Sequence, residues 1–176
     1  MIQNIPKKNN FQAHELRALF EKQLKELYWA EETMISILKN CIADVSSKDL
    51  TEVIKTHRIE TNNHLIRLEN IFMAIGITPE IKIYKALQCL FDEANSINNL
   101  IPQGVVRDAA IIAILQKIKH YEIACYGTMR AYAIALREED IILLLEETLK
   151  EEKDTDLALS YIAESHINIE AADKEI

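Results

Sequence analysis

The sequence predicts an all-α protein, and three features of its composition indicate this class. Only 3 Gly and 3 Pro occur among 176 residues, whereas the turns of a β-rich domain draw on both residue types. Hydrophobic residues make up 49% of the chain but aromatic residues only 6%, so the core must consist mainly of Leu, Ile, Ala and Val. We expect one domain over residues 13–166, with flexible segments at residues 1–12 and 167–176.

Apolar periodicity and turn signals divide the chain into four long helices and one shorter helix. The first helix ends where the polar run at residues 44–47 interrupts the periodicity, and Ser46 or Ser47 can cap the second. Gly76 ends the second helix, and Pro79 starts the short third helix. A Pro-Gln-Gly break at residues 102–104 separates the third helix from the fourth, and a charged run at residues 137–140 separates the fourth helix from the fifth. The five helices are expected over residues 13–43, 48–75, 80–98, 105–136 and 140–166.

The order of these helices predicts a ferritin-like four-helix bundle. Its additional short helix would lie in the crossover between the second and third long helices, which joins two antiparallel hairpins. A simple up-down bundle with an insertion has the same periodicity and remains an alternative.

Charge and cysteine content narrow the class of protein further. The chain has 20 basic and 28 acidic residues, and its net charge of −8 argues against binding to nucleic acid or to an anionic membrane surface. The longest apolar run, residues 109–115, is too short to span a bilayer. The three cysteines are widely spaced, which gives neither a disulfide framework nor a zinc-site spacing. With no signal-peptide pattern at the N-terminus, a cytoplasmic protein is expected.

Acidic residues interrupt the apolar stripes of the predicted helices. Glu31 is the only acid in the stripe of the first helix, and Glu122 is the only acid in that of the fourth element. Glu152 and Asp156, four residues apart, interrupt the stripe of the last helix. A single case has an ordinary explanation, such as a misjudged register or an acid paired with Lys, Arg or Tyr. Repetition in several helices is much harder to obtain by chance.

The two halves of the chain share one arrangement of polar residues. The second helix carries Glu60 and His64, four residues apart and therefore on one helix face. Each half thus offers one carboxylate from its first helix, and a carboxylate with a second ligand from its second helix. Folding the halves together predicts six metal ligands at one level of the bundle: Glu31, Glu60, His64, Glu122, Glu152 and Asp156.

Five inward carboxylates would require compensation, because an unpaired buried charge costs several kcal/mol or more. Two divalent cations would nearly balance them. A ligand set rich in oxygen favours iron or manganese over structural zinc, which prefers Cys and His. The sequence therefore predicts two iron ions, or manganese. Nearby Tyr28, Tyr121 and Tyr126 are candidates for hydrogen bonds to the ligand carboxylates, and His57 for a packed histidine beside the site.

Several stretches of the chain match a known family. The longest are VRDAA at residues 106–110 and HYEIACYGT at residues 120–128, and LYWAE at 27–31 and ETNNH at 60–64 accompany them. Through these stretches the chain resembles the YciE/YciF-type bacterial stress proteins, a branch of the ferritin-like di-iron carboxylate group, over about residues 14–165. The resemblance implies a ferritin-like bundle with a crossover helix, a homodimer, and a dinuclear iron or manganese centre.

The expected function is ferroxidase-type oxidation of iron(II) with O₂ or H₂O₂ in stress protection. Two alternatives remain open. One keeps the metals and makes the chain a manganese-dependent peroxide-removing protein. The other is a metal-free helical interaction or structural protein, in which Lys, Arg or Tyr side chains satisfy the inward acids.

Overall fold

The described part of the chain is helical. In a computed structural model, residues 11–172 are described, and their regular secondary structure consists of helices alone. Helix α1 spans Phe11–Asp44, α2 Lys48–Ala74, α3 Lys85–Leu100, α4 Val105–Leu136 and α5 Glu139–Ile162. A π-helical turn, Ala163–Ile167, leads into the short α6, Asn168–Ala172. The all-α class is thus confirmed, and none of these helices is both long and apolar enough to cross a membrane.

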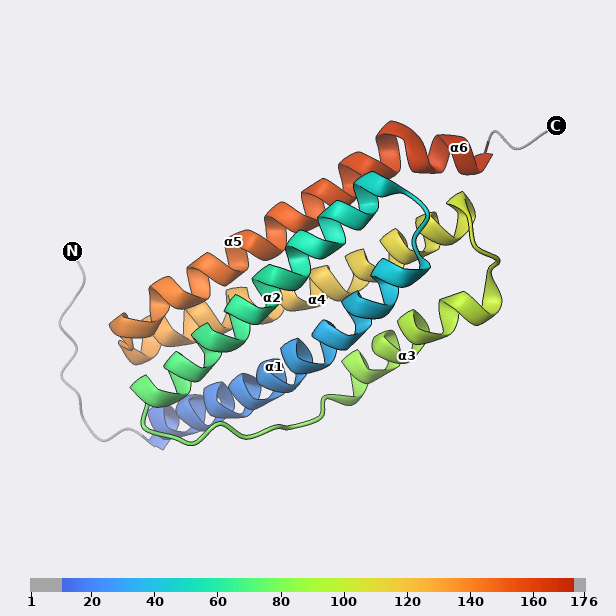
Figure 1. The fold of residues 1–176 in the computed structure, drawn as a ribbon. Helices are drawn as coiled ribbons and strands as arrows, with labels where there is room; N and C mark the ends of the chain where they lie inside the picture. The colour runs from blue at the N-terminus through green and yellow to red at the C-terminus, as the bar shows by residue number, and fades with distance from the viewer. Residues whose placement is uncertain (1–10, 173–176) are drawn as a thin grey trace.

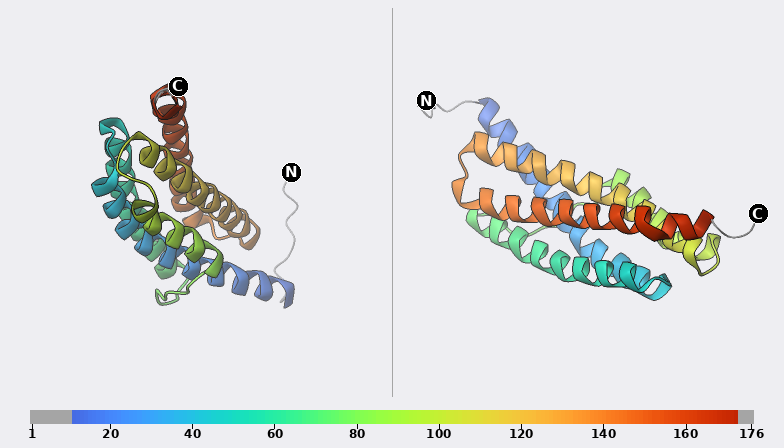
Figure 2. Two further views of the ribbon diagram at one scale, coloured as in Figure 1. Left: turned by 90° about the vertical axis from the view of Figure 1, so that its right-hand side faces the viewer. Right: turned by 90° about the horizontal axis from the view of Figure 1, so that it is seen from above.

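The four long helices form two antiparallel hairpins that pack against each other. Helix α1 pairs with α2, and α4 pairs with α5; across the two hairpins, α1 contacts α4 and α2 contacts α5. Figure 1 shows that each of these neighbours runs in the opposite direction to the next. Helix α3 packs on the outside against α1 and α4, as the two views of Figure 2 show.

The crossover from α2 to α4 differs from the prediction at one point. Helix α2 ends at Ala74, and Gly76 shortly after it has a φ of 74°. The N–H groups of Gly76 and Ile77 donate to the carbonyls of Met73 and Phe72 and close the helix end. The following residues 77–84 are extended and run beside α1 (Figure 1), so α3 begins at Lys85 and the predicted start near residue 80 is wrong. A backbone bond from the Lys82 N–H to the carbonyl of Lys25, at 3.3 Å, holds this segment against α1. The apolar periodicity of a sequence reports on neighbouring residues, so it cannot predict this contact between residues far apart in the chain.

A buried carboxylate fixes the turn between α1 and α2 to the start of α4. Asp108, which is 2% exposed, accepts hydrogen bonds from the backbone N–H groups of Ser46 and Ser47 at 2.9 and 2.8 Å. Ser47 in turn caps α2, because its side chain accepts a bond from the Leu50 N–H. The neighbouring Arg107 donates to two carbonyls at the end of α3 and in the residue after it. The VRDAA stretch therefore joins three elements of the fold.

The apolar core is divided in two along the bundle axis. One half contains Met34, Leu50 and Leu115 among its buried members, and the other contains Leu24, Leu68 and Leu145. The residues between these halves on α1, α2, α4 and α5 include the predicted metal ligands. The bundle thus places a polar layer at mid-height, with apolar side chains above and below it.

The ends of the domain lie close to the predicted limits. Helix α1 begins at Phe11, and the helical chain continues to Ala172, past residue 166 where the predicted domain ends. Most of the predicted flexible N-terminal segment, residues 1–10, and the last residues, 173–176, lie outside the described residues.

Candidate metal centre

Ionisable side chains are concentrated in the polar layer between the two halves of the core. All four long helices of the two hairpins contribute to it. Its ionisable members that are at most 2% exposed are Glu31, His57, His64, Lys119, Glu122, Tyr126 and Glu152. Since a buried charge is strongly destabilising without compensation, each of these groups needs a partner or a bound ion.

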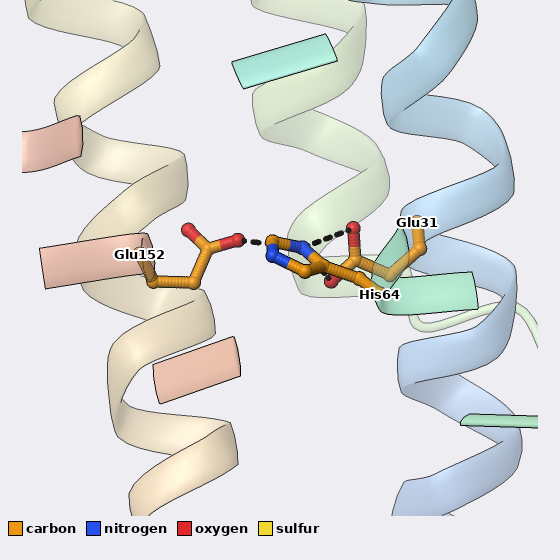
Figure 3. Close-up of side chains that lie close together, drawn as sticks. All are labelled: Glu31, His64 and Glu152. Carbon is orange, nitrogen blue, oxygen red and sulfur yellow. Dashed lines mark hydrogen bonds and ion pairs between the residues drawn. The ribbon is translucent and has the colours of Figure 1, made fainter. Parts of the chain in front are cut away.

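Three of the predicted ligands form a compact group, the Glu–His–Glu cluster of Glu31, His64 and Glu152 (Figure 3). The Nδ1 atom of His64 lies 3.3 Å from Glu31 Oε1 and 3.3 Å from Glu152 Oε1. One potential ligand atom from each residue lies within 4.8 Å of the other two. Ligand atoms held about 2.1 Å from one metal ion are about 3.0–3.4 Å apart. Both distances from His64 Nδ1 to the carboxylates are in this range, so the imidazole and each carboxylate are spaced as two ligands of one ion would be.

The imidazole of His64 is held so that Nδ1 faces the two carboxylates. Its other nitrogen, Nε2, lies 3.0 Å from Glu151 Oε2. Arg67 fixes Glu151 in turn by donating two bonds, at 2.5 and 2.9 Å. Metal-binding histidines commonly donate their second N–H to a carboxylate, which sets the ring orientation. Glu151 and Arg67 thus serve as positioning residues, and the sequence alone does not reveal that role for them.

In the absence of a metal ion, the cluster is charged but compensated. Burial opposes the charged imidazole, but the charge of Glu31 and the hydrogen bond to Glu151 raise the pKa of His64 to about 11. Burial likewise opposes ionisation of Glu31, yet His64 holds the pKa of Glu31 below its usual range. Burial also opposes ionisation of Glu152, but the charge of Lys119 lowers the pKa of this carboxyl below its usual range. A divalent ion at Nδ1 would replace the imidazolium proton.

One of the three tyrosines near the predicted site reaches it. Tyr126 is fully buried, and its hydroxyl donates a 2.6 Å hydrogen bond to Glu31 Oε1. This bond orients the carboxylate toward His64. The other two lie elsewhere: Tyr28 donates to Glu69, and Tyr121 stacks on the ring of Tyr84.

The main feature that the sequence analysis missed is a buried lysine. Lys119 is fully buried, and its Nζ lies 2.5 Å from Glu122 Oε2 and 2.5 Å from Glu152 Oε2. His57 Nε2 lies 2.7 Å from the same nitrogen. We refer to these four residues as the Lys119 cluster. Its position in the sequence could have indicated this contact, since Lys119 precedes Glu122 by three residues and so shares its helix face.

The Lys119 cluster has its own charge pattern. Burial opposes the ammonium, but Glu122 and Glu152 raise the pKa of Lys119. Burial and the nearby ammonium push the pKa of His57 well below its usual range, so the imidazole is neutral and its Nε2 can accept a bond from Nζ. Burial raises the pKa of Glu122 well above its usual range, against the effect of Lys119. The layer thus contains two cations, Lys119 and His64, facing its carboxylates.

The structure places the remaining predicted ligands at the margin of the layer. Glu60 is 26% exposed, accepts a 3.2 Å bond from Thr155, and lies 3.9 Å from His57 Nδ1. Asp156 is 19% exposed and faces the imidazole of His120 at 3.4 Å. Three inward carboxylates are therefore fully buried, where five were expected. The structure brings Glu31, His64 and Glu152 together, and Lys119 links Glu122 to Glu152. Glu60 and Asp156 lie outside this group.

Among the described residues, one group of ligand-type side chains could hold a divalent cation, the Glu–His–Glu cluster. Its donors are two carboxylates and one imidazole, which are ligand types that iron and manganese accept. Beside it, the ammonium of Lys119 lies between Glu122 and Glu152, where a second ion would have to bind. A second divalent ion cannot share that space with the ammonium, because like charges in a low-dielectric interior repel strongly.

Sequence comparison assigns the chain to a family of bacterial proteins. The family described as "Domain of unknown function (DUF892)" matches residues 15–172. The curated Protein YciF of Escherichia coli (strain K12) is 33% identical over 160 residues, which span 89% of this chain and 95% of YciF. The chain belongs to this family, and the predicted resemblance to YciF-type stress proteins is confirmed.

Solved structures of relatives share the fold. The crystal structure of the E. coli stress protein YciF has a TM-score of 0.82 and 32% identity, covering 87% of this chain and 97% of that one. YcfI from Rhodopseudomonas palustris, described as a candidate structural protein, has a TM-score of 0.80 and 31% identity, covering 91% and 97%. A protein from Xanthomonas campestris pv. campestris is 15% identical, with a TM-score of 0.71 and coverage of 92% and 99%, and is similar in fold alone.

Proposed function

We propose that this chain is a ferritin-like metal-binding stress protein that oxidises iron(II) with O₂ or H₂O₂. The observation that carries the proposal is the fully buried Glu–His–Glu cluster, in which one nitrogen of His64 faces two carboxylates while Glu151 holds the other. The antiparallel bundle with a helix in its crossover supports the ferritin-like assignment. Membership in the family of a stress protein supports the stress role.

In this proposal, the substrate iron(II) binds between Glu31, His64 and Glu152, and the protein supplies an oxygen-rich, water-excluding setting. Two anionic carboxylates favour the higher charge of iron(III), which lowers the free energy of the oxidised product relative to iron(II). Each iron(II) gives up one electron. Reduction of H₂O₂ to two waters takes two electrons and two protons, so two iron(II) ions are consumed for each peroxide.

The activity test follows iron oxidation by the metal-free protein. Iron(II) is added anaerobically, O₂ or H₂O₂ is admitted, and iron(III) is followed by near-UV absorbance. We expect oxidation faster than in buffer, and a rate reduced to that of buffer in Glu31→Gln, which keeps the shape of the side chain but removes its charge. Asp154→Ala, an exposed acid on α5, serves as the matched control and should behave as the parent. Equal rates for Glu31→Gln and the parent would refute the assignment.

A second candidate is a metal-free structural protein. The observation favouring it is the Lys119 cluster, because an internal ammonium already lies within ion-pair distance of two of the three buried carboxyl groups. The description of the Rhodopseudomonas relative points the same way. This candidate predicts that iron and manganese neither bind nor raise the melting temperature. The alternative of a manganese-dependent peroxide-removing protein would use the Glu–His–Glu cluster. Metal analysis of the freshly purified protein, together with a peroxide-consumption assay, separates this alternative from the iron proposal.

The predicted homodimer and cytoplasmic location stay predictions. A homodimer interface could use the apolar side chains that α2 exposes at seven-residue spacing, Ile59, Ile66 and Met73, since residues at this spacing share a helix face.

A further inference from the structure

The surroundings of the Lys119 ammonium resemble a coordination shell. Three atoms of ligand type lie 2.5–2.7 Å from Nζ: Glu122 Oε2, Glu152 Oε2 and His57 Nε2. They come from three different helices, α4, α5 and α2. Carboxylate oxygens and a neutral imidazole nitrogen are donors that iron and manganese also bind. A side-chain cation thus occupies a position built from metal-binding groups.

This position adjoins the Glu–His–Glu cluster through a shared residue. Glu152 directs Oε1 toward His64 Nδ1 at 3.3 Å and Oε2 toward Lys119 Nζ at 2.5 Å. One carboxylate therefore links the two positions, as a bridging carboxylate links two cations. The prediction of two ions from the sequence included no side-chain cation in the polar layer. The ammonium of Lys119 occupies one of the two positions, which leaves one position for a metal ion.

Unsatisfied polar atoms point to a cation that binds better than the ammonium. Neither oxygen of Glu122 has a hydrogen bond of good geometry, although Oε2 is within ion-pair distance of Nζ. The Glu122 side chain is fully buried, so no bulk water reaches these oxygens. Such atoms are uncommon in a folded interior. An ammonium satisfies this shell incompletely.

We propose that the ammonium of Lys119 is a tethered cation occupying a second metal position, so that the parent chain binds one divalent ion and removal of the ammonium opens a site for another. The ligands of that additional ion are His57, Glu122 and Glu152. They lie at ammonium distances, whereas divalent metals bind N and O at about 2.0–2.2 Å, so the shell must contract by about half an ångström. Lys119 thereby determines how many metal ions the bundle binds. The first ion in this count rests on the proposed function; the second site does not.

The experiment compares manganese binding by the parent and Lys119→Ala. Manganese(II) is used because it resists oxidation by air, and the amount bound is measured by equilibrium dialysis with metal analysis. We expect one ion per chain for the parent and one additional ion for the variant. Lys117→Ala is the matched control, since Lys117 lies on the same helix but forms an exposed pair with Glu93. It should bind as the parent does.

The two proposals can fail separately. If the parent binds no ion and Lys119→Ala binds one, the proposed function is wrong and the second site stands. If both bind the same number, or if the parent binds two, the inference about Lys119 is wrong. If loss of the ammonium leaves the variant unfolded in EDTA, manganese should restore its helical circular dichroism. Failure to recover the helical signal would overturn the proposal. The double variant Lys119→Ala/Glu122→Gln, which loses one ligand charge, should lose the additional ion.

Discussion

Replacing Glu152 with alanine is expected to lower the free energy of unfolding of the metal-free protein by about 3–5 kcal/mol, because it breaks buried ion pairs from one side only. Glu152 is fully buried and contacts both cations of the polar layer, Lys119 at 2.5 Å and His64 at 3.3 Å. Its loss leaves two positive groups close together with fewer anions to offset them. Urea denaturation in EDTA, followed by circular dichroism, measures the effect.

The control for this variant is Asp154→Ala, on the same helix. Asp154 is 61% exposed and pairs with Lys150 one turn before it, so its loss should cost under about 1 kcal/mol. A Glu152→Ala protein within about 1 kcal/mol of the parent would contradict the pairing of this carboxylate with both buried cations.

The second large effect is expected far from the metal centre, at Asp108. Alanine at this position leaves the backbone N–H groups of Ser46 and Ser47 without their acceptor in a part-buried turn. Buried donors without partners cost about 1–3 kcal/mol each, so the two donors together predict a loss of about 2–6 kcal/mol in the free energy of unfolding. Denaturant melts of the parent and variant measure it.

A graded series makes the Asp108 test specific. Asp108→Asn keeps one acceptor oxygen and should lose less stability than Asp108→Ala. Asp49→Ala removes an acid that is 74% exposed in the first turn of α2 and should change stability by less than about 1 kcal/mol. Equal losses for the alanine variants at positions 108 and 49 would show that the link between the α1–α2 turn and α4 is not what stabilises the fold.

The sequence predicts the helices well wherever local signals decide their ends. The fourth element begins and ends as expected, at residues 105 and 136, because a Pro-Gln-Gly break precedes it and a charged run follows it. The short crossover helix was predicted to begin too early. Pro79 is a valid helix-start signal, but the following residues are held extended against α1 by the contact with Lys25. A tertiary contact overrides a local signal there.

For the site, helical periodicity identifies the level of the polar layer but not its pairing. Glu31, His64, Glu122 and Glu152 are all fully buried at that level. Residues four apart differ by about 40° around a helix axis, enough to turn Glu60 and Asp156 toward the margin of the bundle. Lys119 was missed because a lysine next to an apolar stripe usually extends into solvent. Its burial depends on Glu122 and Glu152, which only the packed helices bring together.

The most direct test of a metal site at Glu31, His64 and Glu152 is a count of iron(II) bound at equilibrium. Metal-free protein is dialysed anaerobically against iron(II), and the bound metal is measured for the parent and for Glu31→Gln, with Asp154→Ala as control. We expect about one iron per chain in the parent and in the control, and loss of that iron in Glu31→Gln. A parent that binds no iron, or a Glu31→Gln variant that binds as much as the parent, would contradict a metal site at Glu31, His64 and Glu152.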